Sequence, residues 1–172
     1  SEVSENDFSQ LVTYKVFNTA GDSSRDYNIK IIYFTGLPII SINTNGIPIV
    51  SKEDYVEGFA SLHGGLQFES LSDQEMEIKG RGNSTWYGPP KKPYQLKFSD
   101  KTAFLGMPED KKWLLLAEYS DKSLIRNKIS FDLGEMSVLE YTPKGEYAEV
   151  FLNGEYNGTY LVSQKVEVTS NR

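Results

Sequence analysis

The sequence predicts an α+β fold, in which a twisted antiparallel sheet carries one main helix. Three observations support this fold class: short alternating apolar and polar runs in the centre of the chain, one stretch with helical spacing, and a closing segment with two Asn-Gly pairs. Alternation is typical of strands with one buried face, and Asn-Gly is typical of a hairpin turn. Strands joined by short turns pair antiparallel, so a doubly wound parallel sheet is not expected.

The beginning of the chain differs in composition from the rest. Residues 1–28 are rich in Ser, Asp, Asn and Glu, with the single apolar patch LVTYKVF, and are expected to be a leader or linker with room for one strand. Residues 29–172 are expected to form one domain. There, NIKIIYFT and LPIISIN predict two strands, NTNGIPI predicts a turn, and SKEDYVEGFA, with Ser51 and Asp54 in capping-box spacing, predicts a short helix.

The centre of the chain carries clear strand patterns. EMEIKG and PYQLKF both alternate, and in the second run Tyr94, Leu96 and Phe98 share one face while Lys97 lies on the other. The glycine- and proline-containing segment KTAFLGMPEDKKW is expected to be a loop that leads into a further strand. FLNGEYNGTYLV then predicts the closing hairpin.

The main helix is predicted over SDKSLIRNKISFDLGEM, where apolar residues recur near helical spacing. Ser120 or Asp121 is available as the N-cap, and Gly134 as the stop signal. Arg126 and Asn127 lie on its first two turns, where their side chains are placed to face a site.

Charge is distributed unevenly along the chain. The net charge is −6, yet residues 79–128 hold eleven Lys or Arg and only five Asp or Glu. A basic centre in an acidic chain fits a localised anionic ligand better than a nucleic acid, although scattered solvated lysines would give the same count. Cysteine is absent, which excludes disulfides, zinc-thiolate sites and cysteine nucleophiles. The apolar runs are too short to span a membrane, and the only histidine, His63, is expected to be an ordinary loop residue.

The segment KGRGNSTWYGPPKKPYQLKF has the chemistry of an anion site. Gly80 and Gly82 allow close backbone approach, and Arg81 can hold phosphate oxygens with two hydrogen bonds. Asn83, Ser84 and Thr85 add neutral donors. The alternative is an ordinary hairpin turn.

Two lysines and many aromatic residues leave further alternatives open. Lys97, with Lys92 second, would point at a phosphate if a ligand covered that face of the sheet, and otherwise both lysines are surface residues. Eleven tyrosines and two tryptophans either pack in the core or form a platform that stacks on sugars.

Four blocks, taken together and in order, resemble the CotH family of atypical secreted protein kinases. They are KGRGNSTW, KKPYQLKF, LGMPEDKKWLLLAEYSDKSLIRNKISFDL and FLNGEYNGTYLVSQKVEV. The resemblance implies the small lobe of a protein kinase-like fold, ATP with Mg²⁺ or Mn²⁺, and phosphorylation of serine in secreted or spore-coat proteins. It also implies an extracellular or spore-coat location. No signal peptide is expected within this chain, because residues 1–10 are polar and acidic.

The resemblance assigns roles to particular residues. The implied nucleotide-binding residues are Arg81, Ser84, Lys92, Lys97 and Gln164, and the implied supporting residues are Asn83, Arg126 and Asn127. Gln164 stands where relatives carry glutamate, and Glu118 where an asparagine is common. The metal-binding and catalytic carboxylates of the family lie beyond the KVEV strand, so this chain alone is expected to be inactive. The alternative function is a non-catalytic module that binds polysaccharide or protein in a spore coat or cellulosome.

Overall fold

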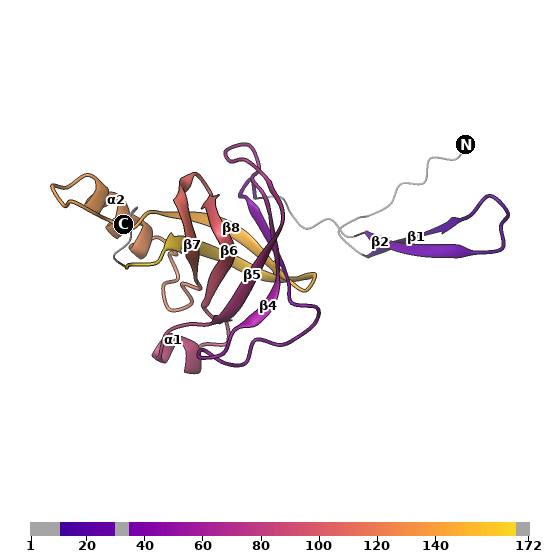
Figure 1. Cartoon of the computed structure of the whole chain (residues 1–172), viewed down its shortest axis with the longest axis horizontal. Helices are drawn as coiled ribbons and strands as arrows, with labels where there is room; N and C mark the ends of the chain where they lie inside the picture. Colours follow the sequence, from indigo (N-terminus) through magenta and orange to yellow (C-terminus); the bar gives the residue numbers. More distant parts are fainter. Residues whose placement is uncertain (1–10, 30–34, 168–172) are drawn as a thin grey trace. The chain divides into compact units, whose positions relative to one another are not determined.

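The computed structural model describes residues 11–29 and 35–167 and divides the chain into two units, 1–36 and 37–172. In the first unit, β1 (Val12–Phe17) and β2 (Ser24–Ile29) form an antiparallel hairpin (Figure 1). The predicted strand NIKIIYFT lies largely in 30–34, outside the described residues. Among the described residues, no helix is long and apolar enough to cross a membrane.

The second unit is a closed seven-stranded barrel, with strand order β3-β4-β5-β6-β7-β9-β8. Its strands are β3 (Ile39–Asn43), β4 (Val56–His63), β5 (Leu71–Gly80), β6 (Tyr94–Phe104), β7 (Met107–Leu116), β8 (Gly145–Leu152) and β9 (Glu155–Gln164). The helices are α1 (Ser84–Tyr87) and α2 (Arg126–Glu135). Neighbouring strands are antiparallel except at one seam, where β3 pairs parallel with β8.

The barrel corrects the predicted α+β fold and the expected likeness to a kinase small lobe: the chain is mostly β. Pairing of β3 with β8, in register Ile39 to Glu149 and Ile42 to Leu152, closes the sheet on itself. The helix does not form a second layer either, because no residue of α2 is buried. A closed sheet buries its own apolar face, so no covering helix is needed.

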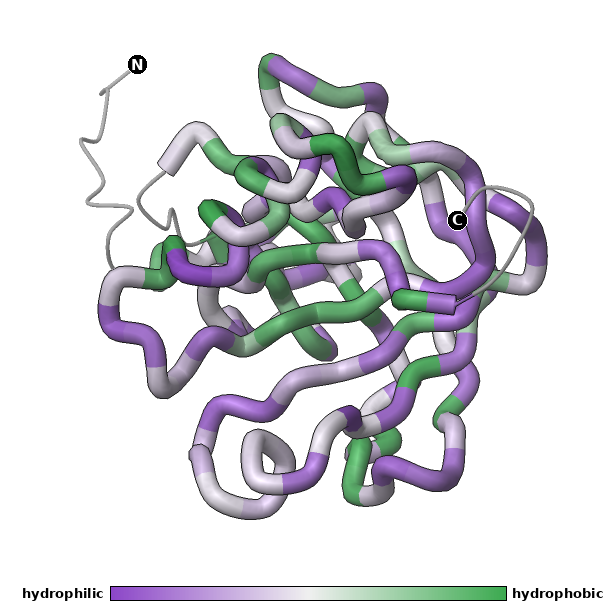
Figure 2. Tube along the Cα trace, turned by 90° about the vertical axis from the view of Figure 1, so that its left-hand side faces the viewer, coloured by the Kyte–Doolittle hydropathy of each residue, from purple (hydrophilic) through white to green (hydrophobic). Residues whose placement is uncertain are grey.

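The interior of the barrel holds the core. Buried residues alternate in β4 and in the first half of β6, whereas β7 and β9 each bury a run of consecutive residues. Hydrophobic stretches, green in Figure 2, lie along the strands of the barrel. The largest fully buried side chains are Trp113, Tyr160, Phe98 and Phe104. The predicted alternation in β6 is confirmed: Tyr94, Leu96 and Phe98 are buried, whereas Lys97 faces out of the barrel.

The predicted helix at 51–60 is wrong. Its capping hydrogen bonds form, since Ser51 Oγ accepts from the backbone N–H groups of Glu53 (3.0 Å) and Asp54 (3.1 Å). These hydrogen bonds are not followed by a helix. Instead, β4 begins at Val56, and every second residue from Gly58 to Leu62 is buried. The capping residues therefore precede a strand, because the residues after them bury every second side chain, which is the period of a strand and not of a helix.

The hairpins follow the turn residues. Asn153 and Gly154, both at positive φ, connect β8 to β9 as predicted, whereas the second Asn-Gly pair lies inside β9 at an irregular register. The expected loop 101–113 is instead a hairpin, since Leu105 and Gly106 also take positive φ and join β6 to β7. Two consecutive positive φ angles give the tight turn that matches strand twist.

Candidate functional site

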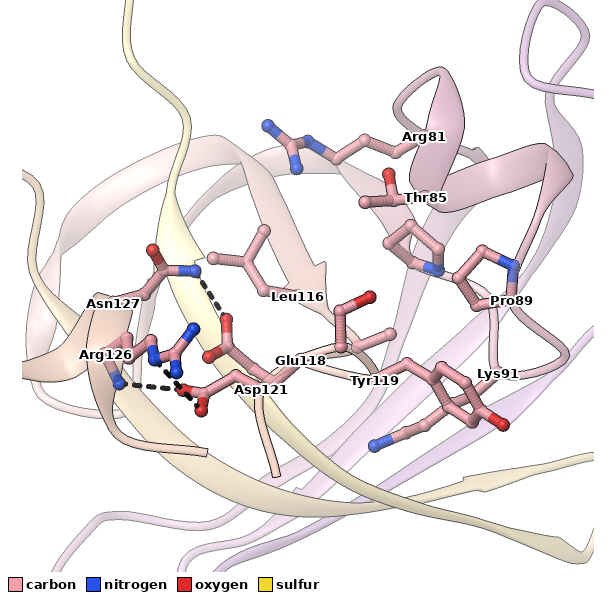
Figure 3. Close-up of a pocket in the computed structure, with 13 residues that line it drawn as sticks. Arg81, Thr85, Pro89, Lys91, Leu116, Glu118, Tyr119, Asp121, Arg126 and Asn127 are labelled. Atoms are coloured by element: carbon pink, nitrogen blue, oxygen red, sulfur yellow. Dashed lines mark hydrogen bonds and ion pairs between the residues drawn. The ribbon is translucent and has the colours of Figure 1, made fainter. Parts of the chain in front are cut away.

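A pocket of about 260 Å³ lies at one end of the barrel, where β5 and β7 end and β6 begins (Figure 3). Residues of the β5–β6 connection form one side, and residues between β7 and α2 form the other. Its volume is near the lower end of the range for small-molecule sites. The lining residues are Arg81, Thr85, Pro89, Lys91, Pro93, Leu116, Ala117, Glu118, Tyr119, Ser120, Asp121, Arg126 and Asn127.

Backbone hydrogen bonds and a tryptophan fix the start of the β5–β6 connection. Gly80 N–H donates to Ser51 O (2.8 Å), and Arg81 N–H donates to Pro93 O (3.1 Å). The Trp86 ring packs so closely on Gly80 that a Cβ there would lie 2.5 Å from it. Glycine is therefore required at position 80, and this packing holds Arg81 at the mouth of the barrel.

Arg81 is the least compensated cation of the pocket. Partial burial lowers the pKa of its guanidinium, and no nearby carboxylate opposes that effect. Within the described part of the chain, no side-chain hydrogen bond or ion pair of this guanidinium is found. A half-buried guanidinium with its donors unused is suited to bind an anion.

Lys91 adds a second positive charge to the pocket. Its Nζ donates to Thr159 O and lies 4.2 Å from the centroid of the Tyr160 ring. Burial lowers the pKa of Lys91, while Glu149 and Glu118 act in the opposite direction. Sequence reasoning singled out the adjacent Lys92 and missed Lys91, because two consecutive lysines outside a strand give no indication of which one faces the site.

Glu118 stands at the opposite side of the pocket in a left-handed backbone conformation, with φ of 51°. Its Oε1 accepts a hydrogen bond from Asn127 Nδ2 (2.6 Å), whereas Oε2 is buried without a partner among the described residues. Burial raises the pKa of the Glu118 carboxyl, and the Asp121 charge adds to this, while Asn127 and Lys91 lower it. Sequence reasoning noted Glu118 only as a departure from the family.

Asp121 organises the start of α2. Its carboxylate accepts from Ser123 Oγ (2.6 Å), from Ser123 N–H (3.1 Å) and from Arg126 N–H (3.0 Å), and lies 3.5 Å from Arg126 Nε. These hydrogen bonds hold the pKa of Asp121 below its usual value. Asp121 therefore serves the local fold and keeps Arg126 and Asn127 beside the pocket.

Three of the predicted site residues, Arg81, Arg126 and Asn127, come together in the pocket. Lys97 does not line it: its Nζ lies 2.6 Å from Glu77 Oε2 on the outer wall of the barrel. Lys92 Nζ donates to Trp86 O at 2.7 Å, also outside the pocket lining. The nucleotide-binding roles of both lysines stay predictions.

The remaining predicted residues are also outside the pocket lining. Ser84 begins α1, and Asn83 Oδ1 accepts from Lys52 Nζ (2.7 Å). Gln164 is buried at the end of β9, where its Oε1 accepts from Lys144 N–H (3.0 Å). Gln164 therefore has a structural partner, and its predicted role beside a nucleotide stays a prediction.

Other hollows of the described structure suit an anion less well. The hollow on the outer wall at Glu57, Glu75 and Glu77 has no Lys or Arg in its lining. A third hollow contains Lys128 and Lys144, but these lie 2.8 Å from Asp132 and 2.6 Å from Glu135. Only the pocket at the barrel end, among these, combines a guanidinium without a carboxylate partner and a lined cavity.

The fold and the site together define a closed β-barrel with a cationic pocket at one end. A family model described as CotH kinase protein matches residues 78–172, which is more than half of the chain and includes every residue of the pocket. The chain belongs to the CotH family, as its four sequence blocks predict. It is also 41% identical over 78 residues to inner spore coat protein H of Bacillus subtilis (strain 168). This match covers 45% of the chain and only 20% of the relative.

Proposed function

We propose that this chain forms the ATP-binding part of a CotH-family protein kinase that phosphorylates serine in secreted or spore-coat proteins. The name of the matching family model and the name of the Bacillus subtilis relative support the enzyme class and the spore-coat location. The match covers about a fifth of the length of that relative. The kinase activity and the substrates of the whole protein are therefore proposed here.

The observation that carries the proposal is Arg81. Its guanidinium is partly withdrawn from water, which lowers its pKa, and has no carboxylate partner in the described structure. Such a charge gains most from an anionic ligand that offers two oxygens, as a phosphate does. Lys91 and Arg126 line the same pocket and add positive potential around a triphosphate.

The described residues of this chain do not form a site for the metal ion of the proposed reaction. No group of three Asp, Glu or His side chains able to hold a metal occurs among them. Mg²⁺ needs several oxygen ligands, and the Asp121 carboxylate already accepts bonds from Ser123 and Arg126. We therefore assign nucleotide binding to this chain and derive no step of phosphoryl transfer from it.

The test is a calorimetric titration of the full-length protein with ATP. Replacing Arg81→Ala should weaken ATP binding about tenfold or more, because a hydrogen bond to a charged group contributes roughly 1.5–3 kcal/mol. Arg25→Ala is the matched control: Arg25 lies in the β1–β2 hairpin and is absent from the pocket lining. Arg81→Lys should recover part of the affinity, since lysine keeps the charge but not the planar pair of donors.

Equal affinity of the wild type and Arg81→Ala would contradict the assignment of this pocket. If the wild type bound no nucleotide but sedimented with isolated spore-coat material or cellulose, the alternative of a non-catalytic binding module would be favoured instead.

A further inference from the structure

One oxygen of Glu118 is unexplained by the fold. Oε1 is fixed by Asn127 Nδ2 at 2.6 Å, whereas Oε2 has almost no contact with solvent and no partner among the described residues. A buried acceptor without a donor is unfavourable, and buried polar atoms in proteins are seldom left so. Glu118 lines the pocket, so a bound molecule that displaces the side chains covering Oε2 would supply the missing donor.

We propose that Glu118 is a specificity residue, whose Oε2 accepts a hydrogen bond from a hydroxyl or amino group on the uncharged part of a nucleotide bound in this pocket. The inference rests on the proposed nucleotide binding and adds a second requirement to it. The ligand must carry an anion for Arg81 and a neutral donor for Glu118.

The two sides of the pocket carry different charges, and this supports one orientation of the bound nucleotide. Arg81 and Thr85 come from the β5–β6 connection, and Glu118 comes from the opposite side, between β7 and α2 (Figure 3). A phosphate is repelled by a carboxylate and attracted by a guanidinium, so it is expected on the Arg81 side. The Glu118 side is left for the sugar or the base, whose hydroxyl and amino groups donate hydrogen bonds.

The orientation of Glu118 is set before any ligand arrives. Asp121 N–H donates to Glu118 O (3.0 Å) in a turn in which Glu118 itself has positive φ. Asn127, in the first turn of α2, then fixes the carboxylate through Oε1. Oε2 is thereby held in one place, which is what a selective contact requires.

A metal ion is the less suitable partner for this oxygen. The second carboxylate of the pocket, Asp121, is occupied by Ser123 and Arg126, so only one carboxylate oxygen of the pair is unused. Lys91 also acts electrostatically on Glu118 and would repel a cation. A neutral donor satisfies the oxygen without that repulsion.

The test compares ATP with inorganic triphosphate in wild type and Glu118→Gln. Glutamine keeps an oxygen for Asn127 and turns its NH₂ group toward the place of Oε2, so that an acceptor becomes a donor. ATP should bind on the order of tenfold more weakly to Glu118→Gln. Triphosphate should bind equally well or more tightly, because a negative charge has been removed. Glu57→Gln, an exposed carboxylate on the barrel wall, is the matched control.

Nucleotide analogues identify the donor. The analogues are 2′-deoxy-ATP, 3′-deoxy-ATP and inosine triphosphate, each of which lacks one donor group of ATP. The analogue that lacks the contacting group should bind wild type and Glu118→Gln with equal affinity. Asn127→Ala, which frees the Glu118 carboxylate to rotate, should lower the affinity for ATP more than the affinity for triphosphate. This second variant keeps Glu118 itself intact.

The outcomes separate this inference from the proposed function. If Arg81→Ala loses ATP binding but Glu118→Gln binds ATP and triphosphate with unchanged affinities, Glu118 has no such role while the nucleotide site stands. An effect of Glu118→Gln that appears with magnesium and disappears in a chelator would mark a metal ligand and overturn the inference. Failure of the wild type to bind ATP would overturn both.

Discussion

Arg81 and Lys97 come from the same basic stretch, yet the barrel places them in opposite situations. Lys97 lies on the outer wall, with its ammonium 2.6 Å from the Glu77 carboxylate of the neighbouring strand. Arg81 lies just beyond the end of β5, beside a pocket and without a carboxylate partner in the described structure. The sequence pattern is the same for both residues, and only the fold distinguishes the charge that has a partner from the charge that has none among the described residues.

Strand pairing explains why the wall compensates its charges. Glu77 and Lys97 are direct partners in the antiparallel register of β5 and β6, and both point outward because their neighbours Ile78 and Leu96 are buried. Opposite charges at paired positions satisfy each other across the strands. One step beyond the paired strands, the residue opposite Arg81 is Pro93, whose carbonyl accepts from Arg81 N–H but which carries no charge, so the Arg81 side chain has no cross-strand ion partner.

The largest effect is expected from Trp86→Ala, which removes the packing beneath the Arg81 turn. Trp86 is 8% exposed, covers Gly80 and meets Tyr94 edge to face at 6.2 Å. The substitution should lower the free energy of unfolding by about 3 kcal/mol, because a large cavity is left. Chemical denaturation followed by intrinsic fluorescence of the second tryptophan measures the change.

The neighbouring Tyr87→Ala is the control for Trp86→Ala. Tyr87 is 70% exposed, so its removal should change stability by no more than roughly 0.5 kcal/mol. Hydrogen exchange should also become faster around Gly80 and Arg81 in Trp86→Ala, with less change at the Glu77–Lys97 pair. Equal loss of protection at both places would mean that the barrel end and the wall are one cooperative unit.

Local patterns predicted most of the strands, but not the closure of the barrel. The alternation in β5 and β6 and the Asn153-Gly154 turn are short-range signals, and the structure confirms them. The seam pairs β3 with β8, more than a hundred residues apart, and no local pattern encodes such a pairing. A helix forms as predicted, but only over Arg126–Glu135, with Ile125 and not Ser120 or Asp121 at its N-cap and with Gly134 inside it. Its apolar residues Ile129 and Leu133 stay exposed.

The site was predictable in part for the same reason. Glycines around an arginine indicate an anion-binding turn, and Arg81 does line the pocket. Glu118 could not be selected, because its proposed role depends on one oxygen that is buried without a partner among the described residues. That property arises only when β7, α2 and the β5–β6 connection are brought together.

The Glu118 carboxyl, of which only Oε2 lacks a partner among the described residues, gives a pH-dependent prediction of intermediate size. Burial raises the pKa of Glu118 above its value in the unfolded chain, so the folded state binds the proton more tightly. Stability due to this group therefore falls as pH rises from about 4.5 through the raised pKa. The charged groups that act on Glu118 are Asp121, which adds to the shift, and Lys91, which opposes it. Tyr147 is also nearby, and its raised pKa keeps it neutral in this range.

Glu118→Gln should consequently unfold at a higher temperature than the wild type near neutral pH, in the absence of ligand. The difference should vanish near pH 4, where the wild-type carboxyl is protonated in both states. Thermal unfolding at several pH values measures it. A variant that is less stable than the wild type at pH 7 would show that the negative charge is compensated in the folded protein, and would remove the reason to expect a ligand donor there.

The smallest effect is expected at the Glu77–Lys97 pair on the barrel wall, which is the direct counterpart of Arg81. The hydrogen bond and charge of Glu77 raise the pKa of Lys97, but both side chains are exposed by more than a third. Exposed ion pairs contribute little, because water screens them and the long side chains lose freedom. A double-mutant cycle with Glu77→Gln and Lys97→Met should give a coupling energy close to the error of the measurement. Lys97→Met should also bind ATP as the wild type does, since the charge of Lys97 is already paired with Glu77.

A loss of ATP affinity as large as that of Arg81→Ala would support Lys97 as the nucleotide-binding lysine that the sequence predicts. It would also show that an ion pair in the free protein does not exclude a residue from ligand binding.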